Sequence, residues 1–76
     1  MKTHRQLEPH EVQMVQEHVD LEARIQRFQQ FIQNPGNVNF SEAEIARMKA
    51  QEMAMSMYLS ILSDRLAVVF KETGNG

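Results

Sequence analysis

Two long stretches of the chain repeat hydrophobic residues at alternating steps of three and four, the period of one face of an α-helix. In residues 9–33 the stripe consists of Met14, His18, Leu21, Ile25, Phe28 and Ile32. In residues 41–71 it consists of Ile45, Met48, Glu52, Met55, Leu59, Leu62, Leu66 and Val69, with one polar member. Stripes of this kind are typical of helices that pack along one another. We therefore expect two long helices.

Local signals mark the helix ends. Pro9 suits a first helical turn, where its missing N–H is not needed. Ser41 and Glu44 have the spacing of a capping box, which predicts a helix start. Residues 34–39 read Asn-Pro-Gly-Asn-Val-Asn and predict a turn. The expected fold is all-α: an antiparallel two-helix hairpin over residues 9–71, with helices at about 9–33 and 41–71 around a turn at 34–40.

The two ends of the chain are expected to lie outside the hairpin. Residues 1–8 form a polar leader, which either adds a short extra helix or stays mobile. Residues 72–76 are expected to form a flexible tail.

Hydrophobic residues outside the two stripes exceed what one hairpin can bury. They are Val12, Val19, Phe31, Met53, Met57, Tyr58, Ile61, Val68 and Phe70. Because a two-helix hairpin has a single internal interface, this excess predicts contacts with other chains. A closed helical homo-oligomer is the default expectation. The methionines of the second helix favour an ordinary oligomer core over a ligand groove, although both interpretations stay open.

Composition excludes several classes of protein. The chain has 76 residues, which allows one small domain that is marginally stable alone. It has no cysteine, so disulfides, cysteine nucleophiles and thiolate zinc sites are excluded. A net charge of −2 argues against a partner that is a nucleic-acid polymer. No uninterrupted apolar run approaches the roughly 18 residues of a membrane span, so no membrane partner is expected.

The sequence contains no recognisable catalytic or metal-binding constellation. His4, His10 and His18 lack the spacing of a zinc motif, and Gly36 stands alone rather than in a phosphate-binding loop. His18 lies on the apolar stripe, so a packed and hydrogen-bonded ring is expected. We therefore expect no enzyme, no cofactor and no metal site.

The arginines say more about a possible ligand than the histidines do. Arg47 and Lys49 are expected to be surface charges paired with acidic residues such as Glu44. Arg65 follows an apolar stretch, so we expect it to be partly buried and to need an anionic partner from the protein or a ligand. Tyr58 lies seven residues earlier, close to the same helix face. An arginine for phosphate and a tyrosine for stacking suit a nucleotide.

The spacing of residues in both helices resembles a known family. The first helix contributes Pro9-His10, residues 15–25 and Phe31-Ile32, and the second contributes Gln51, Met55, Tyr58, Ile61-Leu62 and Arg65-Leu66. From Pro9 to Phe70 the chain is similar to the phage hairpin family shared by Acb2-type anti-CBASS and Tad1-type anti-Thoeris proteins. It resembles the Acb2 type more closely, because it has no strand-like segment.

The resemblance implies a phage-encoded sponge. Proteins of this kind form helical homo-oligomers, commonly hexamers, in the cytoplasm of the infected bacterium. They bind cyclic di- or trinucleotide messengers without cleaving them, which blocks CBASS-type immune signalling. The alternative is a structural or adaptor hairpin that binds a host or phage protein through its methionine-rich face.

The resemblance also implies ligand-binding residues. Arg24 and Arg65 resemble the phosphate-contacting cations of the family, and Arg27, three residues after Arg24, joins the candidates. Acb2-type proteins stack an aromatic side chain near the chain start on a base. Here His10 stands in that region without a neighbouring Tyr or Phe, so His10 replaces the stack or the ligand differs. Tyr58 is expected either to stack on a base or to pack in the core.

Overall fold

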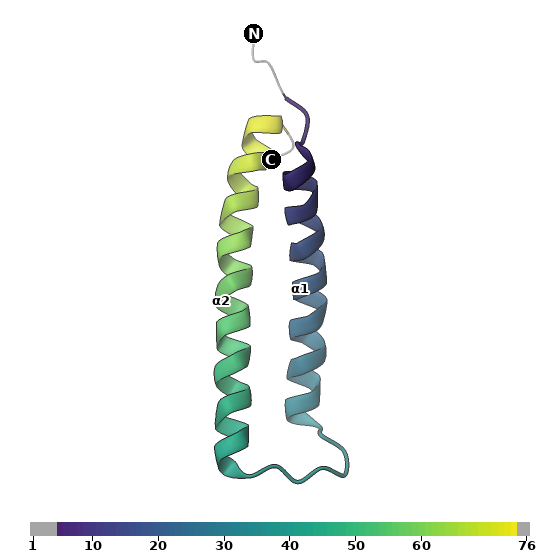
Figure 1. Cartoon of the computed structure of the whole chain (residues 1–76), viewed down its shortest axis with the longest axis vertical. Helices are drawn as coiled ribbons and strands as arrows, with labels where there is room; N and C mark the ends of the chain where they lie inside the picture. The colour runs from purple at the N-terminus through teal and green to yellow at the C-terminus, as the bar shows by residue number, and fades with distance from the viewer. Residues whose placement is uncertain (1–4, 75–76) are drawn as a thin grey trace.

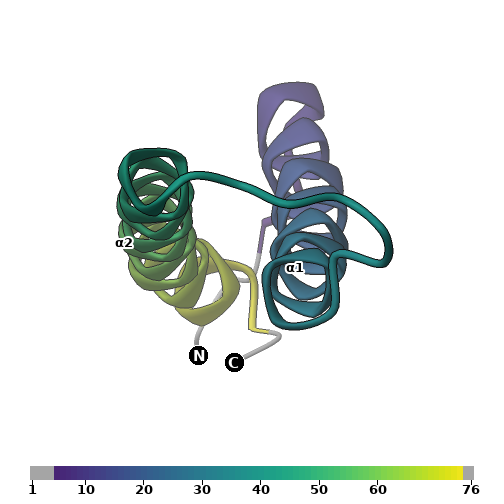
Figure 2. The same cartoon turned by 90° about the horizontal axis from the view of Figure 1, so that it is seen from below.

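Two long helices run antiparallel and form a rod (Figure 1). The computed structural model describes residues 5–74, with α1 at Pro9–Gln33 and α2 at Glu42–Thr73. The rod measures 60 × 17 × 17 Å. Viewed from below, the helices are two separate columns bridged by the connecting segment (Figure 2). The all-α antiparallel hairpin predicted from the sequence is confirmed.

The core lies along the seam between the helices. Its fully or nearly buried hydrophobic residues are Met14, Leu21, Ile25, Met48, Leu62, Leu66 and Val69. Every position of the two predicted stripes is buried or half-buried, including the polar Glu52. His18 is half-buried, and its Nε2 lies 2.8 Å from the Ser63 hydroxyl oxygen on α2, as expected for a packed and hydrogen-bonded ring. The 3.6-residue period therefore placed the seam correctly.

The turn end of the hairpin is held by a helix cap and an aromatic contact. The Ser41 hydroxyl accepts a hydrogen bond of 3.1 Å from the Glu44 N–H and caps α2. In a full capping box the Glu44 carboxylate would also accept a hydrogen bond from the Ser41 N–H. It accepts one from Arg47 Nε at 2.8 Å instead, so only the Ser41 half of the predicted capping box forms. Phe31 and Phe40 pack edge to face with ring centroids 5.7 Å apart.

The open end is held by an ion-pair cluster that the sequence analysis did not predict. Arg5 donates to both carboxylate oxygens of Glu11 at 2.6 Å each, and to Glu72 on α2 at 3.2 Å. The Glu8 N–H donates to Glu11 at 2.8 Å. Arg5 therefore ties the leader to the first turn of α1 and the last turn of α2.

The expectations for the chain ends need correction. Residues 5–8 form no helix: the backbone of Glu8 is extended, and Arg5 and Glu8 are hydrogen-bonded to Glu11. The helix α2 continues to Thr73, and Gly74 closes it in the left-handed conformation (φ 81°) with its N–H bonded to the Phe70 carbonyl. The predicted tail therefore begins too early at residue 72. The predictions for residues 1–4, which include His4, and for residues 75–76 lie outside the described residues.

The outer surface of α2 is unusually apolar. Met53 and Met57 are 71% and 68% exposed, and Ile61 and Val68 are more than half exposed. An 18-residue stretch of α2 reaches a mean hydropathy of 1.4, so by length and composition this helix could cross a membrane, although 17% of the stretch is buried in the hairpin. The sequence prediction of no membrane span counted only uninterrupted apolar residues. It missed this stretch because serines, Asp64 and Arg65 interrupt it, although its mean hydropathy is high.

Candidate functional site

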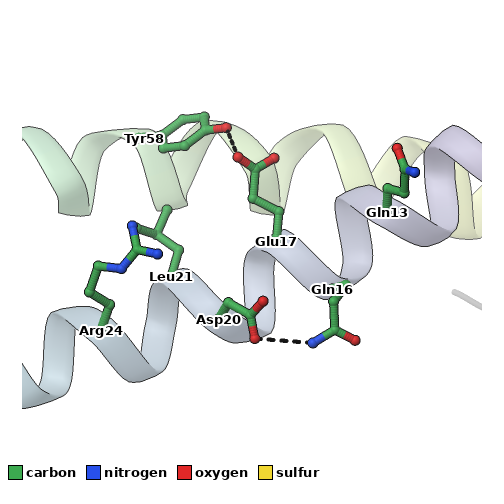
Figure 3. Close-up of a pocket in the computed structure, with 7 residues that line it drawn as sticks. All are labelled: Gln13, Gln16, Glu17, Asp20, Leu21, Arg24 and Tyr58. Carbon is green, nitrogen blue, oxygen red and sulfur yellow. Dashed lines mark hydrogen bonds between the residues drawn. The ribbon is translucent and has the colours of Figure 1, made fainter.

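One side of the hairpin carries a hollow of about 300 Å³ between α1 and α2 (Figure 3). Its lining residues are Gln13, Gln16, Glu17, Asp20, Leu21, Arg24 and Tyr58. All except Tyr58 come from α1. They share this side because positions three, four and seven apart fall on one helix face. The hollow is shallow and mainly polar in its side chains, with Leu21 as its apolar wall.

Tyr58 and Glu17 bridge the two helices at this hollow. The Tyr58 hydroxyl donates a hydrogen bond to Glu17 Oε2, and Figure 3 shows the two side chains pointing toward one another. The bond and the negative charge of Glu17 raise the pKa of Tyr58, because both favour the protonated phenol. Tyr58 is 42% exposed, so its ring is a surface group rather than part of the core.

A second hollow of about 200 Å³ adjoins the first. It is lined by His10, Gln13, Met14, Glu17 and Arg65. Gln13 and Glu17 line both hollows, so the two form one continuous surface. We call this surface the Glu17 face and define it by His10, Gln13, Glu17, Arg24, Tyr58 and Arg65.

Arg24 and Arg65 are available cations on the Glu17 face. Among the described residues neither makes an ion pair or a side-chain hydrogen bond, whereas Arg5 and Arg47 are both paired with glutamates. Asp20, one turn before Arg24, accepts a hydrogen bond of 3.0 Å from Gln16 instead. Free guanidinium groups beside an open hollow can bind carboxylate or phosphate groups through paired hydrogen bonds.

The expected burial of Arg65 is wrong. Arg65 is exposed, because it lies beside the buried stripe that Leu62 and Leu66 occupy rather than on it. Apolar neighbours in the sequence did not reveal this, since adjacent helical residues point about 100° apart. The predicted pairing of Arg47 with Glu44 is confirmed, at 2.8 Å. The same prediction for Lys49 is wrong, because among residues 5–74 Lys49 makes no ion pair or side-chain hydrogen bond.

The candidate residues fall into separate groups. Arg24 and Tyr58 share one hollow, and His10 and Arg65 share the other. His10 and Arg24 are about four helical turns apart on α1, which corresponds to roughly 20 Å along the helix axis. Within one chain, Arg24 and Arg65 line different hollows of the Glu17 face. Arg27 lines a third hollow with Gln30, Phe31, Gln33 and Asn34, apart from the other candidates.

Sequence reasoning missed Gln13 and Glu17, which link the two hollows. A signal existed, because residues 10, 13, 17 and 24 follow one helix face. The chemical inventory of the Glu17 face is two free guanidinium groups, one phenol, one imidazole, one carboxylate and one amide. Within residues 5–74 no group of three or more metal-ligating side chains is present. This face offers donors, acceptors and a ring that can hold a ligand.

Comparison with known proteins identifies a family for this chain. The model of a family described as Sequestin matches residues 8–68, which is most of the chain. No curated protein and no solved structure matches the chain. The matched range contains all of α1, α2 as far as Val68, and every residue that defines the Glu17 face.

Proposed function

The chain belongs to the Sequestin family, and from that premise we propose that it is a phage anti-defence sponge. It binds cyclic di- or trinucleotide second messengers and sequesters them without cleavage in the cytoplasm of the infected bacterium. Effectors of CBASS-type signalling are then deprived of their messenger. The family name denotes sequestration, and the resemblance to Acb2-type hairpins supplies the ligand class.

The observation that carries this proposal is the pair of free arginines on the Glu17 face. Arg24 and Arg65 lack ion-pair partners among residues 5–74, and each lies beside a group that can contact a base or ribose. A guanidinium group binds a phosphate through two parallel hydrogen bonds. The ring of Tyr58 supplies a stacking surface, and Glu17 and Gln13 supply acceptors for amino or hydroxyl groups.

Assembly is part of the same proposal. Because Arg24 and Arg65 of one chain line different hollows, we propose that different chains contribute them to one small cyclic ligand. A closed homo-oligomer, for which we propose a hexamer, repeats each arginine around a ligand that itself repeats its phosphates. The exposed apolar side chains of α2 are consistent with such contacts. Sequestration needs affinity and copy number, so no catalytic group, metal or cofactor takes part.

Thermal unfolding with a ligand panel tests the proposal. The purified protein is heated with cyclic di- and trinucleotides and with cyclic ADP-ribose isomers, and the ligand is recovered afterwards for mass analysis. A true ligand raises the Tm as its concentration exceeds the Kd and returns chemically intact.

Matched arginine variants identify the binding groups. Loss of one charge-assisted hydrogen-bonded contact is worth about 1.5–3 kcal/mol, so Arg24→Ala and Arg65→Ala should each weaken binding roughly 10- to 150-fold. Arg47→Ala removes an equal charge that Glu44 already neutralises and should leave the Kd unchanged. A flat panel, or equal losses in all three variants, contradicts a nucleotide sponge, and a degraded ligand contradicts binding without cleavage.

A second candidate function is an adaptor that binds a protein through the methionine-rich outer face of α2. The exposure of Met53 and Met57 favours it. In that case Met53→Ser and Met57→Ser abolish activity in infected cells, whereas Arg24→Ala and Arg65→Ala do not.

A further inference from the structure

The side of α2 turned away from α1 carries a second stripe, which we call the outer stripe. Its members recur at steps of four and three, and all are exposed: Ala46, Ala50, Met53, Met57, Ile61, Asp64 and Val68. At about 100° per residue, the outer stripe lies roughly 180° around the helix from the buried seam of Met48, Leu62 and Leu66. A helix with two opposite apolar faces needs a second helix to cover the outer one.

The outer stripe has the same spacing in both directions from Met57. Its other members lie in pairs four, seven and eleven residues away, namely Met53 and Ile61, Ala50 and Asp64, and Ala46 and Val68. A two-fold axis at Met57 brings the members of each pair together across an antiparallel contact. We infer that a second copy of this chain packs its outer stripe antiparallel against the first around this axis.

The charged residues beside the stripe select the antiparallel orientation. In a parallel dimer each residue meets its own copy, so Asp64 would face Asp64 within an apolar contact. Lys49 lies eight residues before Met57 and Asp64 lies seven after it, so in the antiparallel dimer Lys49 of one copy lies beside Asp64 of the other. Glu42 lies fifteen residues before Met57 and Lys71 fourteen after it, so Glu42 of one copy likewise lies beside Lys71 of the other. Opposite charges at such flanking positions fix partner and orientation in helical pairs.

These four charges are unused within the hairpin. Among residues 5–74, no ion pair or side-chain hydrogen bond involves Glu42, Lys49, Asp64 or Lys71. Glu42 and Asp64 are separated by about six helical turns, and so are Lys49 and Lys71. Lys49 also follows Glu42 by seven residues, about two turns, so all four share one edge of the outer stripe, with Asp64 on the stripe itself.

The other flank brings like charges near one another in this register, Glu44 with Glu72 as well as two arginines. Arg47, ten residues before Met57, comes within two residues of the level of Arg65 of the second copy. Glu44 already pairs with Arg47 at 2.8 Å, which reduces the repulsion. Tyr58 and Arg65 lie on this flank rather than on the stripe, so the contact runs beside the Glu17 face and not across it. The inference rests on the assembly part of the proposed function and does not involve ligand.

Single cysteines test the register directly, because the chain has none of its own. Two cysteines bridge only if their Cα atoms come within about 7 Å. Under mild oxidation Met57→Cys should form a disulfide-linked dimer by itself. Met53→Cys and Ile61→Cys should form dimers only when the two variants are mixed. Gln26→Cys, exposed on α1, is the matched control and should stay unlinked.

Charge reversal and sedimentation provide the second measurement. Met57→Glu places a carboxylate on the two-fold axis and should raise the Kd of self-association roughly tenfold or more, with helicity retained. Lys49→Glu and Asp64→Lys should each weaken the dimer, and the double variant should recover it.

The inference is overturned if the native protein sediments as a monomer or if Met53→Cys forms a disulfide-linked dimer by itself. It is equally overturned if the Met57→Glu variant sediments with the same mass as the native protein. It is also overturned if the detergent-free protein floats with phosphatidylcholine vesicles instead of dimerising, since the hydropathy of α2 would then serve a bilayer. Ligand binding is measured separately on the same samples. The expected cross-links with a flat ligand panel would refute the sponge alone, and binding without cross-links would refute this interface alone.

Discussion

Leu62 is the side chain on which the hairpin depends most. It is the largest fully buried residue, with 0% of its surface exposed, and it packs with Leu21, Ile25 and Leu66 in the core cluster. Replacing a buried leucine by alanine costs about 2–5 kcal/mol. Because a rod 17 Å wide can partly collapse around the gap, we expect the lower half of that range, about 2–3 kcal/mol.

This loss is large compared with the total stability. At about 0.05–0.15 kcal/mol per residue, a chain of 76 residues is stable by roughly 4–11 kcal/mol. For a domain of this size each 1 kcal/mol corresponds to about 4–8 °C in Tm, so Leu62→Ala should lower the Tm by roughly 8–24 °C. Circular dichroism at 222 nm measures it, at several protein concentrations because assembly makes the Tm concentration-dependent.

Val19→Ala is the matched control, because Val19 is 53% exposed on α1. An exposed truncation should change stability by less than about 0.5 kcal/mol. The assignment of the core to this seam is refuted if Leu62→Ala and Val19→Ala lower the Tm equally, or if Leu62→Ala leaves it unchanged.

Two further predictions concern titrating groups. Hydrogen bonds from Arg5 and from the Glu8 N–H lower the pKa of Glu11 to about 2, from an ordinary value of 4.5. The stability that Glu11 contributes is therefore present above pH 4.5 and lost as the pH falls toward 2, and urea midpoints of the native protein should drop over this window more than those of Glu11→Gln. The hydrogen bond to Glu17 raises the pKa of Tyr58 above 10, so absorbance titration at 295 nm of this single tyrosine should give a midpoint above 10 that Glu17→Gln returns toward 10. An unchanged midpoint in Glu17→Gln contradicts the hydrogen bond.

The hairpin could be read from the sequence because its signals are local. The step of three and four residues identified both faces of the seam, and Pro9 and Ser41 marked the helix starts because capping depends on residues a few positions apart. The same periodicity shows that α2 carries more apolar surface than one seam can bury. The residue types of the Glu17 face were also visible, since His10, Arg24, Tyr58 and Arg65 were all candidates from their chemistry.

Contacts between distant residues needed the folded structure. Arg5 meets Glu72 across 67 positions and Tyr58 meets Glu17 across 41, and no local period predicts such pairs. The packed hairpin also separated Arg24 from Arg65, exposed Arg65, and placed Arg27 in another hollow. A repeat along one helix fixes which side chains share a face. Only the packing of two helices decides which charges are neutralised and which remain free to bind.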